Sequence, residues 1–318
     1  MKTLIRGYRW IAEEPRHRTG LRVLQGAIGL MLFFRIFTEW RFAPYFYGPG
    51  GLGRGSTAPI LGPPGAVLDL AFRSDAGVYA MMLVLACGAF GLVYGFRTRL
   101  ATLCALVPFF MMEQRLPHIG DGGDNVTRLV LMYMLFALGR SQRPSPGGLA
   151  VWLHNIAVLA IVAQLLVVYE TSGIMKVMGE KWHNGTALYY ITQVDWFSHP
   201  LTRALFKNPF AVTLGTFLPI VFLVFFPLAV CTRLKPFWIA FGILFHLSIA
   251  FAMGLVTFAT VMIGLELFLF SDAEFERARH AAARAADAIR RRMTNTGRPF
   301  GARPLVGRPN HRNGNLGV

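Results

Sequence analysis

Long apolar runs separated by short polar loops dominate the chain. A helix that crosses a bilayer needs about 20 mostly apolar residues, because it rises 1.5 Å per residue through a hydrocarbon core of about 30 Å. The pattern gives candidate spans near residues 21–39, 76–95, 100–113, 126–139, 149–170, 210–230, 236–255 and 256–271. The third, fourth and eighth are short, and the last two could form one broken helix around Gly254. We therefore predict an all-α, polytopic membrane bundle of about eight transmembrane helices.

Two of the connecting segments have a distinctive composition. Residues 40–65 are rich in Gly and Pro, so we expect turns there rather than a packed helix. Residues 185–198 contain Tyr189, Tyr190, Trp196 and Phe197. Such amphipathic aromatic side chains suit a segment that lies in the membrane interface.

The two ends of the chain are basic and less apolar. We expect residues 1–20 to form a cytoplasmic amphipathic segment and residues 21–272 to form the transmembrane domain. Residues 273–293 can form a basic interfacial helix, and the Gly, Arg, Pro and Asn content of residues 294–318 predicts disorder.

Positive charge lies mainly outside the apolar segments. The formal net charge is +16, only 15% of the residues are charged, and 54% are hydrophobic. This composition excludes a soluble enzyme, and the charge distribution is that of a membrane protein rather than of a nucleic-acid-binding protein. Cations in short loops mark the cytoplasmic side, and alternate loops carry Arg97, Arg99, Arg140, Arg143, Arg233 and Lys235. We therefore predict a multi-pass membrane protein with both termini cytoplasmic.

Lys176 is the first candidate for chemistry, because ionisable groups at membrane depth are costly and usually functional. On a continuous helix it shares one face with Tyr169 and Gly173, and the glycine permits close approach of a helix or a ligand. A lysine in a dry pocket loses proton affinity and can act as a base. The alternative is a lysine that reaches the membrane surface and pairs with Glu180.

His246 lies in the middle of the seventh candidate span, and Glu266 lies in the eighth. A histidine ten residues into a helix cannot easily reach water, so it needs a partner, a ligand or a bound water molecule. Glu266 is closer to the cytoplasmic end and easier to hydrate. Hydrogen bonding inside the bundle and substrate binding are both open for these two residues.

A third polar cluster, formed by His118, Asp121, Asp124 and Asn125, precedes the fourth candidate span. Its side chains include metal-ligand types, but the intervening glycines leave their geometry open. Asp124 or Asn125 at a helix start is well explained as an N-cap. We therefore predict no metal site here.

Two stretches resemble a known family. The run from Gly173 to Lys176, with Trp182 and Gly185 downstream, resembles the AGxxK...W..G stretch in the membrane part of vitamin K-dependent gamma-carboxylases. The run from Phe245-His246 to Gly254, followed by Phe258 and Met262, resembles the FH...F..G.F..M segment of the same family. The broader set is the horizontally transferred transmembrane (HTTM) domain family, which includes the sporulation-delaying toxin B-type bacterial membrane proteins. The resemblance covers roughly residues 20 to 272.

The resemblance implies that Lys176 is a base acting on a quinol-like lipophile, with His246 as a second catalytic candidate. It also suggests a location in the bacterial plasma membrane and substrate-binding candidates at Gly173, Trp182, Gly185, Asp124 and Asn125. Glu266 joins these candidates because of its position at membrane depth. The carboxylases carry a histidine after paired asparagines, where this chain has Asp124-Asn125-Val126, and they continue into a large lumenal domain. We therefore expect a quinol-sized pocket rather than gamma-glutamyl carboxylation of a protein.

Three classes of function follow from these observations. The first is base chemistry on a quinol-like lipophile or on a peptide presented at the membrane. The second is a non-catalytic accessory factor for maturation or export of a secreted peptide or toxin, with membrane lipids and that peptide as partners. The third is a transporter, which is less well supported because few polar residues are available to line a path.

Overall fold

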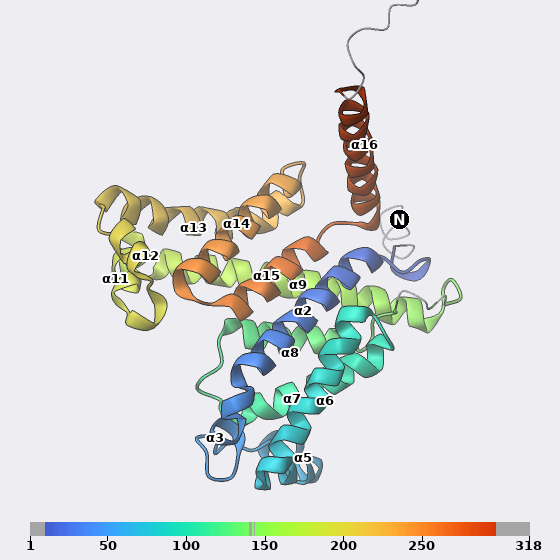
Figure 1. Cartoon of the computed structure of the whole chain (residues 1–318), viewed down its shortest axis with the longest axis vertical. Coiled ribbons are helices and arrows are strands. Elements are labelled where there is room, and N and C mark those ends of the chain that lie inside the picture. The colour runs from blue at the N-terminus through green and yellow to red at the C-terminus, as the bar shows by residue number, and fades with distance from the viewer. Residues whose placement is uncertain (1–9, 140–141, 143, 297–318) are drawn as a thin grey trace, which may run out of the picture. The chain divides into compact units, whose positions relative to one another are not determined.

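The computed structural model describes residues 10–139, 142 and 144–296 (Figure 1). In this part of the chain all regular structure is helical, with no strand. A helix occupies each of the eight predicted positions: α2 (Arg18–Glu39), α6 (Asp75–Tyr94), α7 (Thr98–Arg115), α8 (Gly122–Met134), α9 (Leu149–Met178), α13 (Pro209–Val230), α14 (Lys235–Met253) and α15 (Val256–Phe268). The all-α prediction is therefore confirmed.

Five stretches of the described residues are long and apolar enough to cross a membrane. They are Arg18–Tyr47, Asp75–Tyr94, Leu149–Met178, Pro209–Val230 and Lys235–Met253. Val256–Phe268 adds a sixth if it is counted together with the helix that follows it. The chain is thus a multi-pass integral membrane protein with five or six helices that meet this standard, fewer than the eight predicted.

The connecting segments contain more helix than their composition predicts. Residues 40–65 hold η1 (Trp40–Phe42), α3 (Ala43–Tyr47), α4 (Ala58–Leu61) and the start of α5 (Pro63–Leu68), which is followed by η2 (Asp69–Arg73). The expectation of turns alone was wrong, because prolines occupy the first turns of α3, α4 and α5, where a missing N–H costs nothing. The segment after α9 forms α10 (Glu180–His183), α11 (Ala187–Gln193), η3 (Asp195–Phe197) and α12 (Pro200–Leu205).

The long helices pack around a shared apolar core. α2 packs against α6 and α15, α6 against α7, and α9 against α13, while α14 contacts both α13 and α15 (Figure 1). Gly173 in α9 faces the α13 backbone, since an added Cβ would lie 3.0 Å from the Val224 nitrogen. The close helix approach expected at this glycine is therefore present.

Several helix starts and helix ends lie together at one end of the bundle, where hydrogen bonds join them. Arg22, near the start of α2, donates to the Leu92 and Val93 carbonyls at the end of α6. Arg99, near the start of α7, donates to the Ala137 carbonyl beyond the end of α8. The Thr19 amide at the start of α2 donates to Asp272, which follows α15. These ends also include the start of α9, where His154 accepts from the Leu138 amide.

A second unit begins at Ala273. It contains almost all of α16 (Asp272–Thr296), so residues 273–293 are helical, and their position at the membrane interface stays a prediction. The predicted disorder of 294–318 falls mainly on residues outside the described part of the chain, as does about half of the predicted segment 1–20.

Candidate functional site

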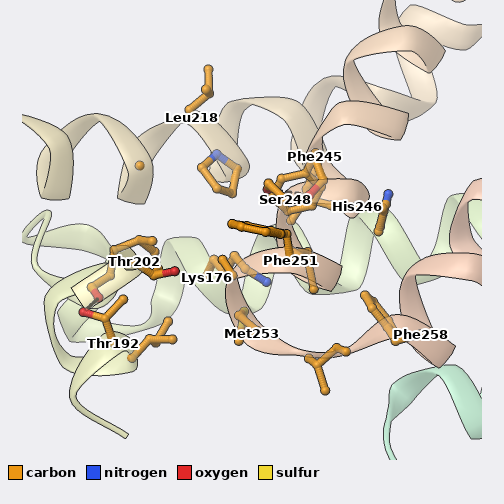
Figure 2. A pocket seen from close by; sticks show the side chains of 18 of the residues that line it. Lys176, Thr192, Thr202, Leu218, Phe245, His246, Ser248, Phe251, Met253 and Phe258 are labelled. Atoms are coloured by element: carbon orange, nitrogen blue, oxygen red, sulfur yellow. Dashed lines mark hydrogen bonds between the residues drawn. The ribbon is translucent and has the colours of Figure 1, made fainter. Parts of the chain in front are cut away.

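A cavity of about 630 Å³ lies where the C-terminal part of α9 meets α11, α12, α13, α14 and the start of α15. Its wall is mostly aliphatic and aromatic, with a few polar side chains (Figure 2). Its volume is within the range of small-molecule sites, which combine an apolar lining with a few well-placed polar groups. Lys176 and His246, predicted separately from two distant stretches, both line it.

Lys176 is half-buried and reaches the cavity because α9 continues to Met178, eight residues beyond the predicted span. Its ammonium donates to the Ser172 hydroxyl at 2.9 Å and lies 5.0 Å from the centre of the Trp182 ring. The predicted alternative partner, Glu180, does not pair with it, and no carboxylate in the described part of the chain lies within ion-pair distance of its ammonium. A cation held only by a hydroxyl and a ring keeps N–H groups for an anionic or polar ligand.

His246 is 1% exposed and sits between two acceptors. Its Nδ1 lies 2.9 Å from the Gly242 carbonyl oxygen and 3.2 Å from Glu266 Oε1. The Tyr169 hydroxyl donates to the same Glu266 oxygen at 2.6 Å. Tyr169 on α9, His246 on α14 and Glu266 on α15 therefore form one buried polar cluster, which we call the Tyr169–Glu266–His246 cluster.

Gly242 makes this cluster sterically feasible. A Cβ at position 242 would lie 2.0 Å from Glu266 Oε1. The absence of a side chain therefore creates the space in which the carboxylate approaches the histidine one turn further along α14. Glu266 itself is completely buried, and its Oε2 has no hydrogen-bond partner among the described residues.

The remaining predicted residues of the Lys176 stretch lie close to the cavity. Trp182 lines the cavity and carries the Lys176 contact. Gly173 lies against α13, and Gly185 faces the Phe217 ring, where an added Cβ would be 3.1 Å away. Both glycines therefore position helices around the cavity.

Asp124 and Asn125 lie in a different cluster. Asp121 caps α8, with its side chain accepting from the Asp124 amide and the Asp124 side chain accepting from the Asp121 amide. Asp124 also pairs with Arg35 at 2.6 Å, and Asn125 accepts from Arg128. Neither Asp124 nor Asn125 lines the cavity.

The capping arrangement has electrostatic consequences for Asp121. Burial, followed by the neighbouring Asp124 carboxylate, raises the pKa of the Asp121 carboxyl above its ordinary value. His118 does not complete a metal site with the two carboxylates, because the described residues contain no group of three His, Cys, Asp or Glu side chains suited to a metal.

Several polar residues of the cavity were not predicted from the sequence. Ser172, Thr192, Thr202 and Ser248 all line it. Tyr169 was predicted only to share a helix face with Lys176. Their spacing of seven residues was the one sequence signal that Tyr169 lies at the cavity. Thr192 and Thr202 lie in α11 and α12, whose position over the cavity no spacing rule predicts.

The arrangement provides two kinds of polar group on one apolar wall. Lys176 offers N–H donors, and His246 offers a ring nitrogen supported by a buried carboxylate. A lipophilic molecule with a small polar headgroup fits both the lining and these groups.

Comparisons with known proteins add little to this geometry. No family model matches the chain, and no solved structure matches it. The chain is 28% identical over 193 residues to the uncharacterized protein YitO of Bacillus subtilis (strain 168), a match that covers 54% of this chain and 60% of the relative. The chain therefore spans less than two thirds of the length of that relative.

Proposed function

We propose that this membrane protein binds a lipophilic small molecule of quinol-like size in the cavity and removes a proton from it, with Lys176 and His246 as the reacting or binding groups. One observation carries the proposal. A largely apolar cavity of about 630 Å³ brings together two ionisable side chains that are 70 positions apart in the chain. Ionisable groups that meet at membrane depth are expected to serve function.

The resemblance to the HTTM family belongs to the same proposal. Of the residues that carry that resemblance, Gly173, Gly185 and Gly254 do not line the cavity, whereas the others do: Lys176, Trp182, Phe245, His246, Phe258 and Met262. This agreement supports family membership through the site rather than through overall similarity. We further propose a bacterial plasma membrane location.

An alternating arrangement of eight segments, with both termini cytoplasmic, is also proposed. The hydrogen bonds that join the starts of α2, α7 and α9 to the ends of α6, α8 and α15 support alternation. Basic residues such as Arg22, Arg97 and Arg99 lie at that end, in agreement with a cytoplasmic side. The cavity then opens toward the opposite side of the membrane.

Mass spectrometry of gently purified protein tests the ligand proposal. Wild type is expected to retain a discrete lipophile, and Lys176→Ala and His246→Ala are expected to lose it while remaining folded in the membrane. Lys181→Ala is the matched control, because Lys181 also lies over an aromatic ring, that of Tyr190, but does not line the cavity.

The same experiment distinguishes the alternative classes. If wild type and all variants carry only bulk phospholipid, the lipophile proposal fails and an accessory role in peptide maturation becomes the better account. That role predicts that Lys176→Ala still complements a deletion strain.

A further inference from the structure

We propose that Glu266 and the Gly242 carbonyl hold the neutral His246 ring with its proton on Nδ1, so that Nε2 presents a lone pair to the cavity and selects ligands that carry a hydroxyl. This inference rests on the proposed function, because it concerns the ligand of the same cavity. It assigns Glu266 as a positioning residue and names the chemical class of the headgroup.

The first step concerns the two neighbours of Nδ1. The Gly242 carbonyl oxygen, 2.9 Å away, can only accept a hydrogen bond. Glu266 Oε1, 3.2 Å away, already accepts from the Tyr169 hydroxyl and offers Nδ1 a second acceptor. With Glu266 as the carboxylate, an unprotonated Nδ1 would face two oxygen lone pairs, so the proton of the neutral ring belongs on Nδ1.

The second step concerns Nε2. It makes no hydrogen bond with any residue in the described part of the chain, although His246 is 1% exposed and lines the cavity. The rings of Phe245 and Phe258 lie 5.1 and 5.8 Å from the imidazole centre and offer it no acceptor or donor. Because His246 lines the cavity, a ligand bound there can donate a hydrogen bond to Nε2.

The third step identifies the ligand class. Nε2 accepts a hydrogen bond, whereas the Lys176 ammonium on the same cavity only donates. A lipophilic alcohol or phenol offers Nε2 a hydroxyl donor, and the rest of such a molecule suits the apolar lining. An ether of the same shape offers no donor to Nε2.

The same geometry defines where a proton would go. Transfer along the bond breaks the ligand O–H bond and forms Nε2–H, leaving the negative charge on the ligand oxygen. The imidazolium keeps its Nδ1–H directed at Gly242 and Glu266, and the Glu266 carboxylate balances its charge.

Nuclear magnetic resonance of full-length protein in nanodiscs, with ¹⁵N in the histidine rings, tests the tautomer. The His246 signals are identified by their loss in His246→Phe. We expect a protonated Nδ1 and an unprotonated Nε2 in wild type. In Glu266→Gln, the amide can donate to Nδ1, so the population should move toward the Nε2-protonated form. Thr260→Ala is the matched control, because Thr260 lies on the same helix as Glu266, donates to its own backbone at Val256 and does not line the cavity.

Two probes test the ligand class. 4-Nonylphenol should shift the Nε2 signal and bind roughly tenfold more tightly than its methyl ether, as expected for one hydrogen bond. This preference should disappear in His246→Phe and Glu266→Gln and persist in Thr260→Ala.

Three results would overturn the inference: an Nε2-protonated ring in wild type, equal binding of phenol and ether, or a Glu266→Gln protein identical to wild type. If the tautomer and the phenol preference are found but the purified protein carries no lipophile, the proposed function fails while the positioning role of Glu266 stands.

Discussion

The contact between Glu266 and His246 depends on the absence of a side chain at Gly242. The two residues are 20 positions apart, and their contact depends on the bend at Gly254 and Leu255 between α14 and α15. Spacing along the chain identified each residue as a candidate but could not pair them, because the bend angle is not encoded in apolar periodicity. Lys176 and Tyr169 could be placed near each other from the sequence alone, because both lie on one face of a continuous helix.

Gly242→Ala should destabilise the protein, because the new methyl group would overlap Glu266 Oε1 and push the carboxylate away from His246. Overpacking of this kind costs about 1–3 kcal/mol. Thermal unfolding of detergent-solubilised protein measures the loss. Gly50→Ala is the control, since nothing lies within 4 Å of a Cβ at that position. Equal midpoints for the two variants would show that the space at Gly242 is not required.

At the scale of helices, the apolar runs of the sequence predicted where the long helices lie but not the residues at which they end. α9 was expected to end near residue 170, where the apolar run stops, yet it continues through Gly173 and Lys176 to Met178. Tertiary contacts with α13 stabilise these extra turns, and contacts between distant segments are invisible to a local hydropathy pattern. The capping of α2 is a second example, since its cap comes from a residue more than 250 positions away.

Asp272 provides that cap. The residue before α2, His17, makes no side-chain cap, whereas the Asp272 carboxylate accepts from the Thr19 and Arg18 amides at 2.6 and 3.1 Å. Asp272→Ala should therefore lower the free energy of unfolding by about 0.5–2 kcal/mol. Asp272→Asn, which keeps an acceptor oxygen, should lose less, and chemical denaturation in mixed micelles can compare the two. An unchanged Asp272→Ala protein would show that the cap contributes nothing.

The same carboxylate predicts a pH dependence. Burial alone would raise the pKa of Asp272, but the hydrogen bonds from Thr19 and Arg18 outweigh it and lower the pKa below 3.8. The folded state therefore favours the charged form. Its stabilising contribution is present above pH 3.8 and is lost as the pH falls through the lowered value. Unfolding measurements from neutral pH to below 3.8 should show a smaller acid loss for Asp272→Asn than for wild type; equal losses would contradict the assignment.

On the scale of the whole molecule, the membrane class was readable from composition, whereas the cavity was not. Apolar runs and the placement of cations depend only on the bilayer as a solvent. The cavity depends on how α11 and α12 fold back beside α13, and their short, mixed sequences contain no strong periodic signal. Asp124 and Asn125 were assigned to the site from the family resemblance, whereas in the fold they pair with Arg35 and Arg128 and do not line the cavity.

The proposed orientation can be tested with single cysteines in a background without Cys87, Cys104 and Cys231. Trp196 is 88% exposed in the segment after α9, and Arg233 is exposed between α13 and α14. In intact cells, a membrane-impermeant maleimide should label Trp196→Cys, whereas Arg233→Cys should require permeabilisation. The opposite pattern would reverse the orientation, and labelling of both would contradict alternation between these segments.

Site-specific photo-crosslinking tests the central claim, occupancy of the cavity, most directly. A benzophenone amino acid at Leu218, on the cavity wall, is compared in native membranes with one at Leu228, which is 66% exposed on the same helix outside the cavity. Intact-protein mass spectrometry should show one discrete lipophile adduct at position 218, lost when Lys176→Ala is added, and heterogeneous phospholipid adducts at position 228. Identical phospholipid adducts at both positions, unaffected by Lys176→Ala, would contradict a dedicated ligand site.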